Sequence, residues 1–344
     1  MDSEGIYVIV TNQCSSRSHH RALTLIVATI LFSIVGCDSE SDDERRERLA
    51  KRAMSEAVAE VKAGTTDSIK IDEAEIIDVH LAQLKGLTQL KSLVLHNTKV
   101  TDAGLASLRD LENIEVIKLV GSQISDDGLK HLRGLKHLQS LDVGGAAMNG
   151  AGLEHLGHLP NLRFLNLERT HITDEGLSQL RTLDQLEFLR LGSDKITDAG
   201  MQHLAAMKSL KHLYLNDISL SDAGIKSISK MTQLRSLNLD DTRITDAGLA
   251  QLTSITGLEH LRLGSKQITD AGIEHLRSLR SLRHLHLMDV QLTDEGLRHI
   301  GKMTHLESLY LDRTKITDEG IEQLHKDHPK IHFHQDQTHV HGEH

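Results

Sequence analysis

Apolar residues recur with a strict 24-residue spacing over most of the chain. The repeating units begin at Leu90, Ile114, Leu138, Leu162, Leu186, Leu210, Leu234, Leu258, Leu282 and Leu306. Counted from the first residue of a unit, positions 1, 4, 6, 11, 16, 19 and 22 are apolar, and Asp327 is the one exception in the ten units. A period of this length is typical of proteins built from stacked repeats.

The spacing within a unit predicts its local structure. Positions 4 and 6 alternate as in a strand with one buried face. Positions 16, 19 and 22 step by three, as in a short α or 3₁₀ helix with one edge facing inward. A single strand–turn–helix unit buries too little apolar surface to offset its conformational entropy, so we expect the units to fold only as an array.

The repeated motif resembles the leucine-rich-repeat family. The segment at residues 162–177 reads LRFLNLERTHITDEGL and carries the Thr-Asp-x-Gly-Leu variant of the repeat. The resemblance spans residues 66–334 and implies an α/β solenoid: a curved horseshoe of about 10 to 11 repeats of 24 residues, with a parallel concave sheet and short convex helices.

Position 9 is less regular than the rest of the motif. Thr98, Thr170, Thr242 and Thr314 stand where many family members carry an Asn ladder, whereas Asp194, Ile218, Lys266 and Val290 depart from that column. These departures bear on the regularity of the turns and leave the predicted fold unchanged.

The two ends of the array are predicted to close differently. Residues 45–65 are expected to form a capping helix with Leu49, Ala53, Ala57, Val58 and Val61 on one side. A degenerate eleventh unit begins near Thr66 and carries Ile69, Ile71, Ile76, Leu81, Leu84 and Leu87 in register. Ile331 and Phe333 alternate like a final strand, and residues 335–344 are expected to be a disordered, His-rich tail.

The N-terminal segment has the outline of a secretion signal. A basic stretch is followed by an uncharged run, Ala22–Gly36, which is short for a membrane-spanning helix. The sequence Ile34-Val35-Gly36-Cys37 resembles the lipobox of bacterial lipoproteins, which implies a leader over residues 1–36 and a lipidated Cys37. The acidic residues that follow predict a flexible tether over 37–44. An uncleaved N-terminal anchor is the alternative.

These features predict a membrane-anchored lipoprotein of the bacterial cell envelope that faces the periplasm or the exterior. The sixteen residues before Arg17 are an unusual preface to such a leader, so the true translation start is expected downstream of Met1. The formal net charge of −10 argues against nucleic acid as a partner. Both cysteines, Cys14 and Cys37, precede the repeats, so no disulfide is expected to stabilise them.

Positions 3, 5, 7 and 8 of each unit are expected to point from the concave sheet into solvent. The candidate partner-binding residues come from positions 5 and 3: Lys118, Asp142, Asn166, Arg190, Tyr214, Asn238, Arg262, His286 and Tyr310 at position 5, and Phe164, Phe188, His212 and His284 at position 3. Aromatic and Arg side chains are typical of protein-binding surfaces. Recognition of carbohydrate or cell wall by the Tyr and Phe rings is an alternative.

Histidine suggests a second alternative, a His-rich envelope protein that binds metal. The chain has 24 His, seven of them in the last twenty residues, and neutral imidazole binds zinc, copper or nickel. On the predicted sheet His260, His284 and His286 form a triangle that is able to hold an ion or respond to pH. The spacing imposes no coordination geometry, so no metal site and no cofactor is assigned.

Two further recurring residues are interpreted structurally. The Asp at position 13, as in Asp102, precedes each helix and is expected to cap it, in preference to forming a calcium ladder. The Gly at position 15, as in Gly104, is expected to permit close approach of adjacent turns. No nucleophile elbow, HExxH or phosphate-binding Gly loop is present, so an enzyme and a small-molecule substrate are not favoured.

Overall fold

The computed structural model describes residues 41–72, 74–96 and 98–335, and the predicted leader, Cys37 and the end of the tail lie outside them. Within the described residues the chain forms one sheet of twelve parallel strands in sequence order. The predicted solenoid is therefore confirmed. The strands are β1 (Ser68–Ile71), β2 (Ser92–Leu95), β3 (Val116–Leu119), β4 (Ser140–Asp142), β5 (Phe164–Glu168), β6 (Phe188–Gly192), β7 (His212–Leu215), β8 (Ser236–Leu239), β9 (His260–Gly264), β10 (His284–Met288), β11 (Ser308–Asp312) and β12 (His332–Gln335).

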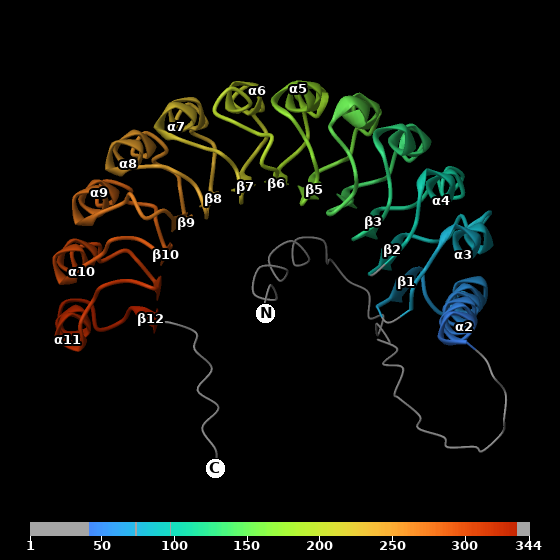
Figure 1. Cartoon of the computed structure of the whole chain (residues 1–344), viewed down its shortest axis with the longest axis horizontal. Helices are drawn as coiled ribbons and strands as arrows, with labels where there is room; N and C mark the ends of the chain where they lie inside the picture. Colours follow the sequence, from blue (N-terminus) through green and yellow to red (C-terminus); the bar gives the residue numbers. More distant parts are fainter. Residues whose placement is uncertain (1–40, 73, 97, 336–344) are drawn as a thin grey trace, which may run out of the picture. The chain divides into compact units, whose positions relative to one another are not determined.

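Helical segments connect successive strands and lie along the outer side of the arc, while the strands line its inner side (Figure 1). The α-helices are α2 (Asp42–Lys62), α3 (Asp78–Leu81), α4 (Asp102–Ala106), α5 (Asp174–Ser178), α6 (Met201–Leu204), α7 (Asp222–Ile228), α8 (Asp246–Leu252), α9 (Asp270–Leu276), α10 (Asp294–Gly301) and α11 (Asp318–Asp327). The 3₁₀ helices are η1 (Ala82–Leu84), η2 (Asp126–Leu132), η3 (Ala151–His158) and η4 (Gln179–Thr182).

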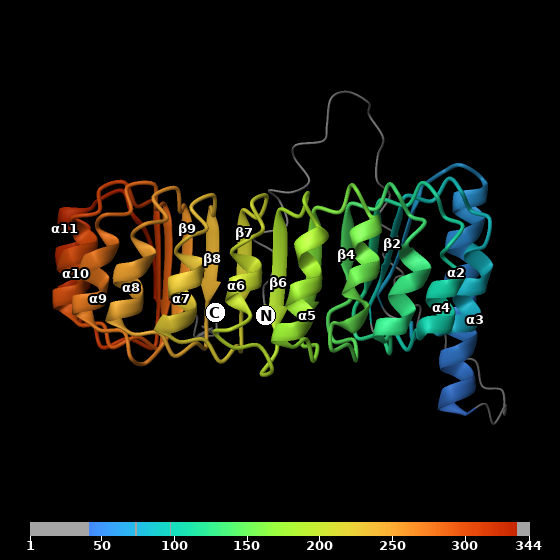
Figure 2. The ribbon, with the colours of Figure 1, turned by 90° about the horizontal axis from the view of Figure 1, so that it is seen from above.

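Each strand pairs with its neighbour in a register shifted by one 24-residue unit, as in Ser236↔His260 and His260↔His284. Equivalent positions of successive units therefore stand side by side along the sheet, and in the view from above the units follow one another like parallel slabs (Figure 2). One aliphatic core runs between strands and helices, and its residues include Leu93, Leu189 and Leu285 at position 4. The 24-residue period thus sets the packing directly.

Asp327 interrupts the apolar pattern without leaving a charge in the core. It is the last residue of α11, its side chain is exposed, and the next residue, His328, is buried instead. The last helix, with ten residues, is longer than the other helices of the repeats, and position 22 of the last unit no longer faces inward.

The N-terminal end of the core is covered by α2, which begins at Asp42, so residues 42–44 are helical where the sequence predicted a tether. Its buried face consists of Ala50, Met54, Val58 and Val61. The prediction that Leu49 belongs to this face was wrong, because 49% of its surface is exposed. Spacings of four, four and three residues keep the buried side chains on one helical stripe, and Leu49 falls beside it.

The position-13 Asp residues bind the next unit and do not cap their own helices. The helix caps are Thr or Ser one residue earlier: the Thr269 side chain, for example, accepts a hydrogen bond from the Ala271 N–H. The carboxylate of Asp246 accepts two hydrogen bonds from Thr269 of the following unit, at 2.8 Å from N and 2.6 Å from Oγ1. The same pair of bonds joins Asp78–Thr101, Asp102–Ser125, Asp174–Thr197, Asp198–Ser221, Asp222–Thr245, Asp270–Thr293 and Asp294–Thr317.

This inter-unit bond explains the Gly at position 15. A Cβ on Gly272 would collide with Oδ1 of Asp246, and the same contact recurs at Gly104, Gly128, Gly200, Gly224, Gly248, Gly296 and Gly320. The expectation that these residues permit close approach of adjacent turns is confirmed. Asp126 adapts to the variant unit at Gly150 by accepting from the N–H groups of Asn149, Gly150 and Gly152.

The turns after the strands are of two kinds. In most units position 8 has a positive φ, as at Asp217 (54°) and Asp289 (56°). In two units position 8 is a serine: Ser193 and Ser265 each donate a hydrogen bond from Oγ to a carbonyl of the preceding unit, both at 2.8 Å. Of the four departures at position 9, Asp194 and Lys266 follow these serines, whereas Ile218 and Val290 are buried in the ordinary turn.

Across the part of the chain that the structure describes, no helix is both long enough and apolar enough to cross a lipid bilayer.

Candidate functional site

Positions 3 and 5 of the twelve strands form two adjacent columns on the inner side of the sheet, which we call the inner-face columns. Within the described part of the chain no helix covers the inner side (Figure 1). Every Phe and Tyr in the described residues lies on a strand, and Phe164, Phe188, Tyr214 and Tyr310 lie in these columns. The columns therefore gather four of the five Phe and Tyr side chains of the described residues on the inner side of the sheet.

The structure brings five of the predicted residues together at β5, β6 and β7. The rings of Phe164 and Phe188 stack with centroids 4.6 Å apart, and Phe188 also stacks on Tyr214 at 4.8 Å and on His212 at 5.7 Å. The Arg190 guanidinium carbon lies 5.0 Å from the Tyr214 ring centroid and 5.7 Å from that of Phe188. Adjacent parallel strands are spaced so that such rings stack.

Glu168 completes this cluster and was not singled out from the sequence. Its carboxylate lies 3.6 Å from Arg190 Nη1 and accepts a hydrogen bond of 2.9 Å from Asn216 Nδ2. Burial raises the pKa of Glu168, and the Arg190 charge opposes that shift. Burial likewise raises the pKa of the Tyr214 hydroxyl. The cluster thus holds an arginine against two stacked rings and beside one carboxylate.

A second cluster of predicted residues lies on β9, β10 and β11. The rings of His260 and His284 stack in parallel at 4.3 Å, and Tyr310 stacks on His334 at 4.4 Å. Burial, together with the neighbouring His284, lowers the pKa of His260 to about 4, so its ring is neutral at pH 7. His286 Nε2 lies 2.6 Å from Asp312 Oδ2. Because His260 and His284 stack face to face, they do not form the converging triangle considered from the sequence.

Acidic residues at position 7 orient the basic residues at position 5. Arg262 donates to Asp240 Oδ2 from Nε at 2.9 Å and from Nη2 at 2.8 Å. Glu168 and Asp312 have the same relation to Arg190 and His286. Glu168 and Asp312 were missed as site residues, although their shared position 7, beside a basic residue at position 5 of a nearby strand, is a signal that the sequence contains.

The prediction that position 5 points into solvent was wrong for four of the candidate residues. Asp142, Asn166, Tyr214 and Asn238 face the inner side but keep at most 7% of their surface exposed. Large side chains on strands about 4.8 Å away cover them. The Asn166 and Asn238 side chains accept hydrogen bonds from the backbone N–H of Glu168 and Asp240, so both shape the wall behind the arginines.

Lys118 and Asp142 lie apart from both clusters, on β3 and β4. Burial lowers the pKa of Lys118, and the nearby Asp142 carboxylate opposes the shift. Asp142 Oδ1 accepts a hydrogen bond of 3.1 Å from the Gly144 N–H. The inner face therefore carries Lys118 and Asp142 on β3 and β4, whereas its aromatic side chains begin at β5.

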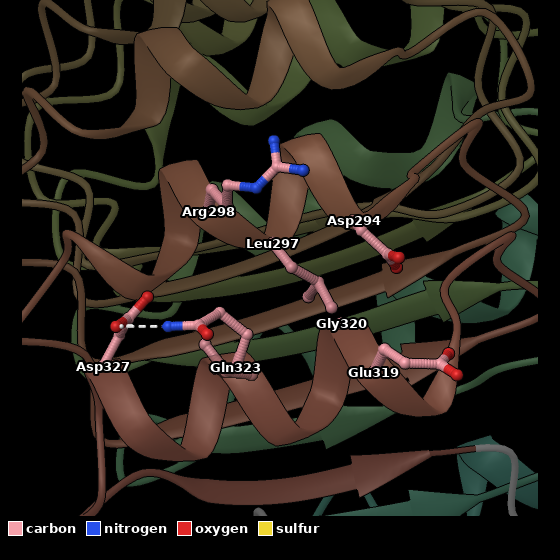
Figure 3. Close-up of a pocket in the computed structure, with 8 residues that line it drawn as sticks. Asp294, Leu297, Arg298, Glu319, Gly320, Gln323 and Asp327 are labelled. Carbon is pink, nitrogen blue, oxygen red and sulfur yellow. Dashed lines mark hydrogen bonds between the residues drawn. The ribbon is translucent and has the colours of Figure 1, made fainter.

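Two further kinds of functional site would be a cluster of metal ligands and a hollow in the surface. In residues 41–335, apart from positions 73 and 97, no group of three or more His, Cys, Asp or Glu side chains is placed to hold a metal ion. A small hollow of about 190 Å³ lies on the outer side between α10 and α11 (Figure 3). Among its polar groups, Gln323 bonds Asp327 at 2.9 Å and Asp294 accepts hydrogen bonds from Thr317.

Comparison with known proteins agrees with this architecture. A family model of the leucine-rich repeat matches residues 158–180, 230–252, 278–301 and 302–324. Among solved structures, an internalin of Listeria monocytogenes is similar, with a TM-score of 0.58 and 22% identity over 85% of this chain and 94% of that chain. A leucine-rich-repeat protein of Leptospira interrogans has a TM-score of 0.50 and 19% identity over 74% of each chain. No curated protein sequence matches.

Proposed function

We propose that the chain, which has the leucine-rich-repeat fold, is a non-enzymatic binding module that holds a protein partner on the inner face of its sheet. We further propose that it acts outside the cytoplasm, tethered to a bacterial membrane through a lipid on Cys37. A protein partner is the kind of ligand typical of this fold, and the remaining arguments concern where it binds.

The observation that carries the proposal is the cluster of Phe164, Phe188, Arg190 and Tyr214. Aromatic and arginine side chains supply most of the binding energy in protein interfaces, and they do so best when they are held rigidly. Here each ring stacks on its neighbour and Arg190 is held against two of them. The cluster loses little conformational entropy on binding, because its side chains are already ordered.

The same stacking argues against carbohydrate as the ligand. A sugar binds an aromatic residue by lying on its exposed ring face, but the neighbouring rings cover the faces of Phe188, and Phe188 and Tyr214 each expose only 7% of their surface. The ring edges and the arginine remain for contact. This geometry suits the side chains of a protein better than a sugar ring.

The site is tested by replacing Arg190 and Tyr214 together by Ala in the full chain. Partner capture from detergent-solubilised envelope, followed by hydrogen exchange of the purified complex, should show loss of the complex in this variant and protection of β5–β7 in the unaltered protein. The matched control is Arg280→Ala with Lys208→Ala, two exposed residues in the turns that lead from a helix to the next strand. Undiminished capture by the Arg190/Tyr214 variant, or protection confined to the outer helices, would refute the site.

The tether is tested separately. With the native leader in a bacterial host, mass spectrometry of the mature N-terminus should find an acylated Cys37, and Cys37→Ser should release the protein from the membrane fraction. A mature chain that begins elsewhere and remains membrane-bound after Cys37→Ser would rule out the lipoprotein assignment.

A further inference from the structure

The sequence also has a longer internal period, of 72 residues, which is three of the 24-residue units. Residues 189–200 read LRLGSDKITDAG, and residues 261–272, which lie 72 positions later, read LRLGSKQITDAG. The units before them both have Asn-Leu at positions 5 and 6, as Asn166-Leu167 and Asn238-Leu239. Three consecutive units therefore recur as one block.

The structure repeats with the same 72-residue step. The two serine turns, at Ser193 and Ser265, are separated by this step and make the same hydrogen bond at the same distance of 2.8 Å. The isolated bridges Thr197↔Ser219 and Thr269↔Gln291 are separated by it as well. The block is thus repeated in the structure as well as in the sequence.

Each block builds the same constellation around an arginine. The first contains Asn166, Glu168, Arg190, Gly192 and Tyr214, and we call it subsite 1. Subsite 2 contains the equivalent residues Asn238, Asp240, Arg262, Gly264 and His286.

In both subsites the Asn and the acidic residue beside the arginine form the same hydrogen-bonded arrangement, which we call the wall. The Asn side chain accepts a hydrogen bond from the backbone N–H of the acidic residue, at 3.0 Å in subsite 1 and 2.8 Å in subsite 2. The acidic residue pairs with the arginine, at 3.6 Å in subsite 1 and 2.8 Å in subsite 2. Position 7 of the arginine's own strand is a glycine in both subsites, Gly192 and Gly264, so no side chain stands there.

The wall carboxylate orients each guanidinium and leaves part of it available. In subsite 2 Asp240 receives Nε and Nη2 of Arg262, so the Nη1 donors face away from that pair. A guanidinium has five N–H donors, and a second carboxylate is able to bind those that remain. The Arg190 and Arg262 side chains keep 19% and 38% of their surface exposed, so each is accessible but held in place.

The charges around the two arginines are largely paired. Among the described strands, the inner-face columns carry four fixed cations, Lys70, Lys118, Arg190 and Arg262, and a single carboxylate, Asp142. Three of these cations pair with a carboxylate at position 7: Lys70 with Asp72, Arg190 with Glu168 and Arg262 with Asp240. The columns therefore offer a ligand the remaining N–H donors of two oriented guanidinium groups, and not a net positive charge. A carboxylate is a group that binds such donors strongly.

The separation of the two arginines indicates the form of the ligand. Arg190 on β6 and Arg262 on β9 are three strand spacings apart, which is about 14 Å. An extended peptide advances about 3.4 Å per residue, so side chains four residues apart along it match that separation. Resting on the proposed protein-binding function, we propose that subsites 1 and 2 together bind an extended acidic segment of the partner, which places one carboxylate at Arg190 and a second, four residues away, at Arg262.

The test uses the full chain and three synthetic peptides of equal length and extended sequence. The first carries two Glu four residues apart, the second carries two Glu two residues apart, and the third carries one Glu and one Gln. Binding is followed by nuclear magnetic resonance of the arginine Nε–H groups, which detects weak complexes. The first peptide should shift the signals of both Arg190 and Arg262 with one midpoint, and should bind at least ~10-fold more tightly than the third.

The variants Arg190→Gln and Arg262→Gln should each lower the affinity for the first peptide to that of the third, and the double variant should abolish binding. Arg280→Gln, in the exposed turn between α9 and β10, is the matched control and should change nothing. Thermal unfolding shows whether each variant is folded. If a variant does not fold, the signal shifts in the unaltered protein still test the proposal. Equal affinity for the three peptides, or a shift of only one arginine, overturns the duplicated subsite.

These outcomes are separable from those of the protein-binding proposal. If hydrogen exchange finds a captured partner on β5–β7 but the first peptide shows no preference, the duplicated acidic-segment site falls and protein binding at the inner face stands. If the first peptide binds as expected and no envelope protein protects the inner face, the subsites stand and the proposed partner site in the envelope falls.

Discussion

Both carboxylate oxygens of Asp246 accept hydrogen bonds from one residue of the next unit, Thr269, whose backbone N and Oγ1 lie 2.8 and 2.6 Å away. Thr269 in turn caps the helix α9 through the same Oγ1, which accepts from the Ala271 N–H. One threonine therefore joins the stacking of two units to the start of a helix.

We predict that Asp246→Ala lowers the free energy of unfolding by about 0.5–1.5 kcal/mol, because the backbone N–H and the hydroxyl of the exposed Thr269 lose a charged acceptor. The matched control is Asp318→Ala in the last unit. Asp318 occupies the same position before α11, but the described residues contain no following unit for it to bind. Urea denaturation should separate the two variants, and equal losses would show that helix-end charge, and not the inter-unit bond, is responsible.

Gly272→Ala should destabilise the protein by about 1–3 kcal/mol, because the new Cβ would collide with Asp246 Oδ1. In an Asp246→Ala background the same substitution should cost much less, since the colliding atom is gone. Gly134→Ala serves as the control, because the nearest atom to its Cβ is the Arg109 carbonyl oxygen at 3.7 Å. Additive losses in the double variant would contradict the contact.

Met54→Asp and Leu49→Asp should have opposite outcomes, although both residues lie on α2. Met54 is completely buried against the first unit, whereas 49% of the Leu49 surface is exposed. A carboxylate at residue 54 loses its hydration and has no partner, which should cost on the order of 3 kcal/mol. Thermal unfolding should show little change for Leu49→Asp. Similar midpoints for the two variants would mean that α2 does not cap the array.

The stacked pair His260–His284 predicts a dependence of stability on pH. The pKa of His260 is lowered from 6.5 to about 4 in the folded protein, so between these values the unfolded chain binds more protons. Stability should therefore fall as the pH decreases from about 6.5 to about 4, and His260→Gln should weaken this dependence. Nuclear magnetic resonance titration of the His260 ring gives the pKa directly. A value near 6.5 would contradict the burial of this ring.

The sequence predicts the architecture because the positions that pack the core are the ones that repeat. Leu189 and Leu285, for example, occupy the same position of their units and the same place in the sheet. The role of the position-13 Asp could not be obtained in the same way. Thr and Asp stand next to each other before each helix, and both are good cap residues. Which one binds the helix and which one binds the next unit depends on the stacking distance, which the local sequence does not contain.

The same limit applies to the candidate site. The sequence placed Phe188, Arg190 and Tyr214 on one face, because side chains alternate along a strand. It did not show that Tyr214 is almost covered or that Glu168 reaches Arg190, since both facts depend on the sizes of side chains on neighbouring strands. The 24-residue register tells which residues stand side by side on adjacent strands. How deeply each of them is buried can be read only from the folded structure.

Because every Asp–Thr pair joins one unit to the next by the same two hydrogen bonds, a complete 24-residue segment has matching ends wherever it is cut at equivalent positions. Gain or loss of such a segment during evolution would leave the junction chemistry intact. The distance between Arg190 and Arg262 is then a quantity that evolution is able to change in steps of one strand spacing, so ligand length and scaffold length are able to vary together.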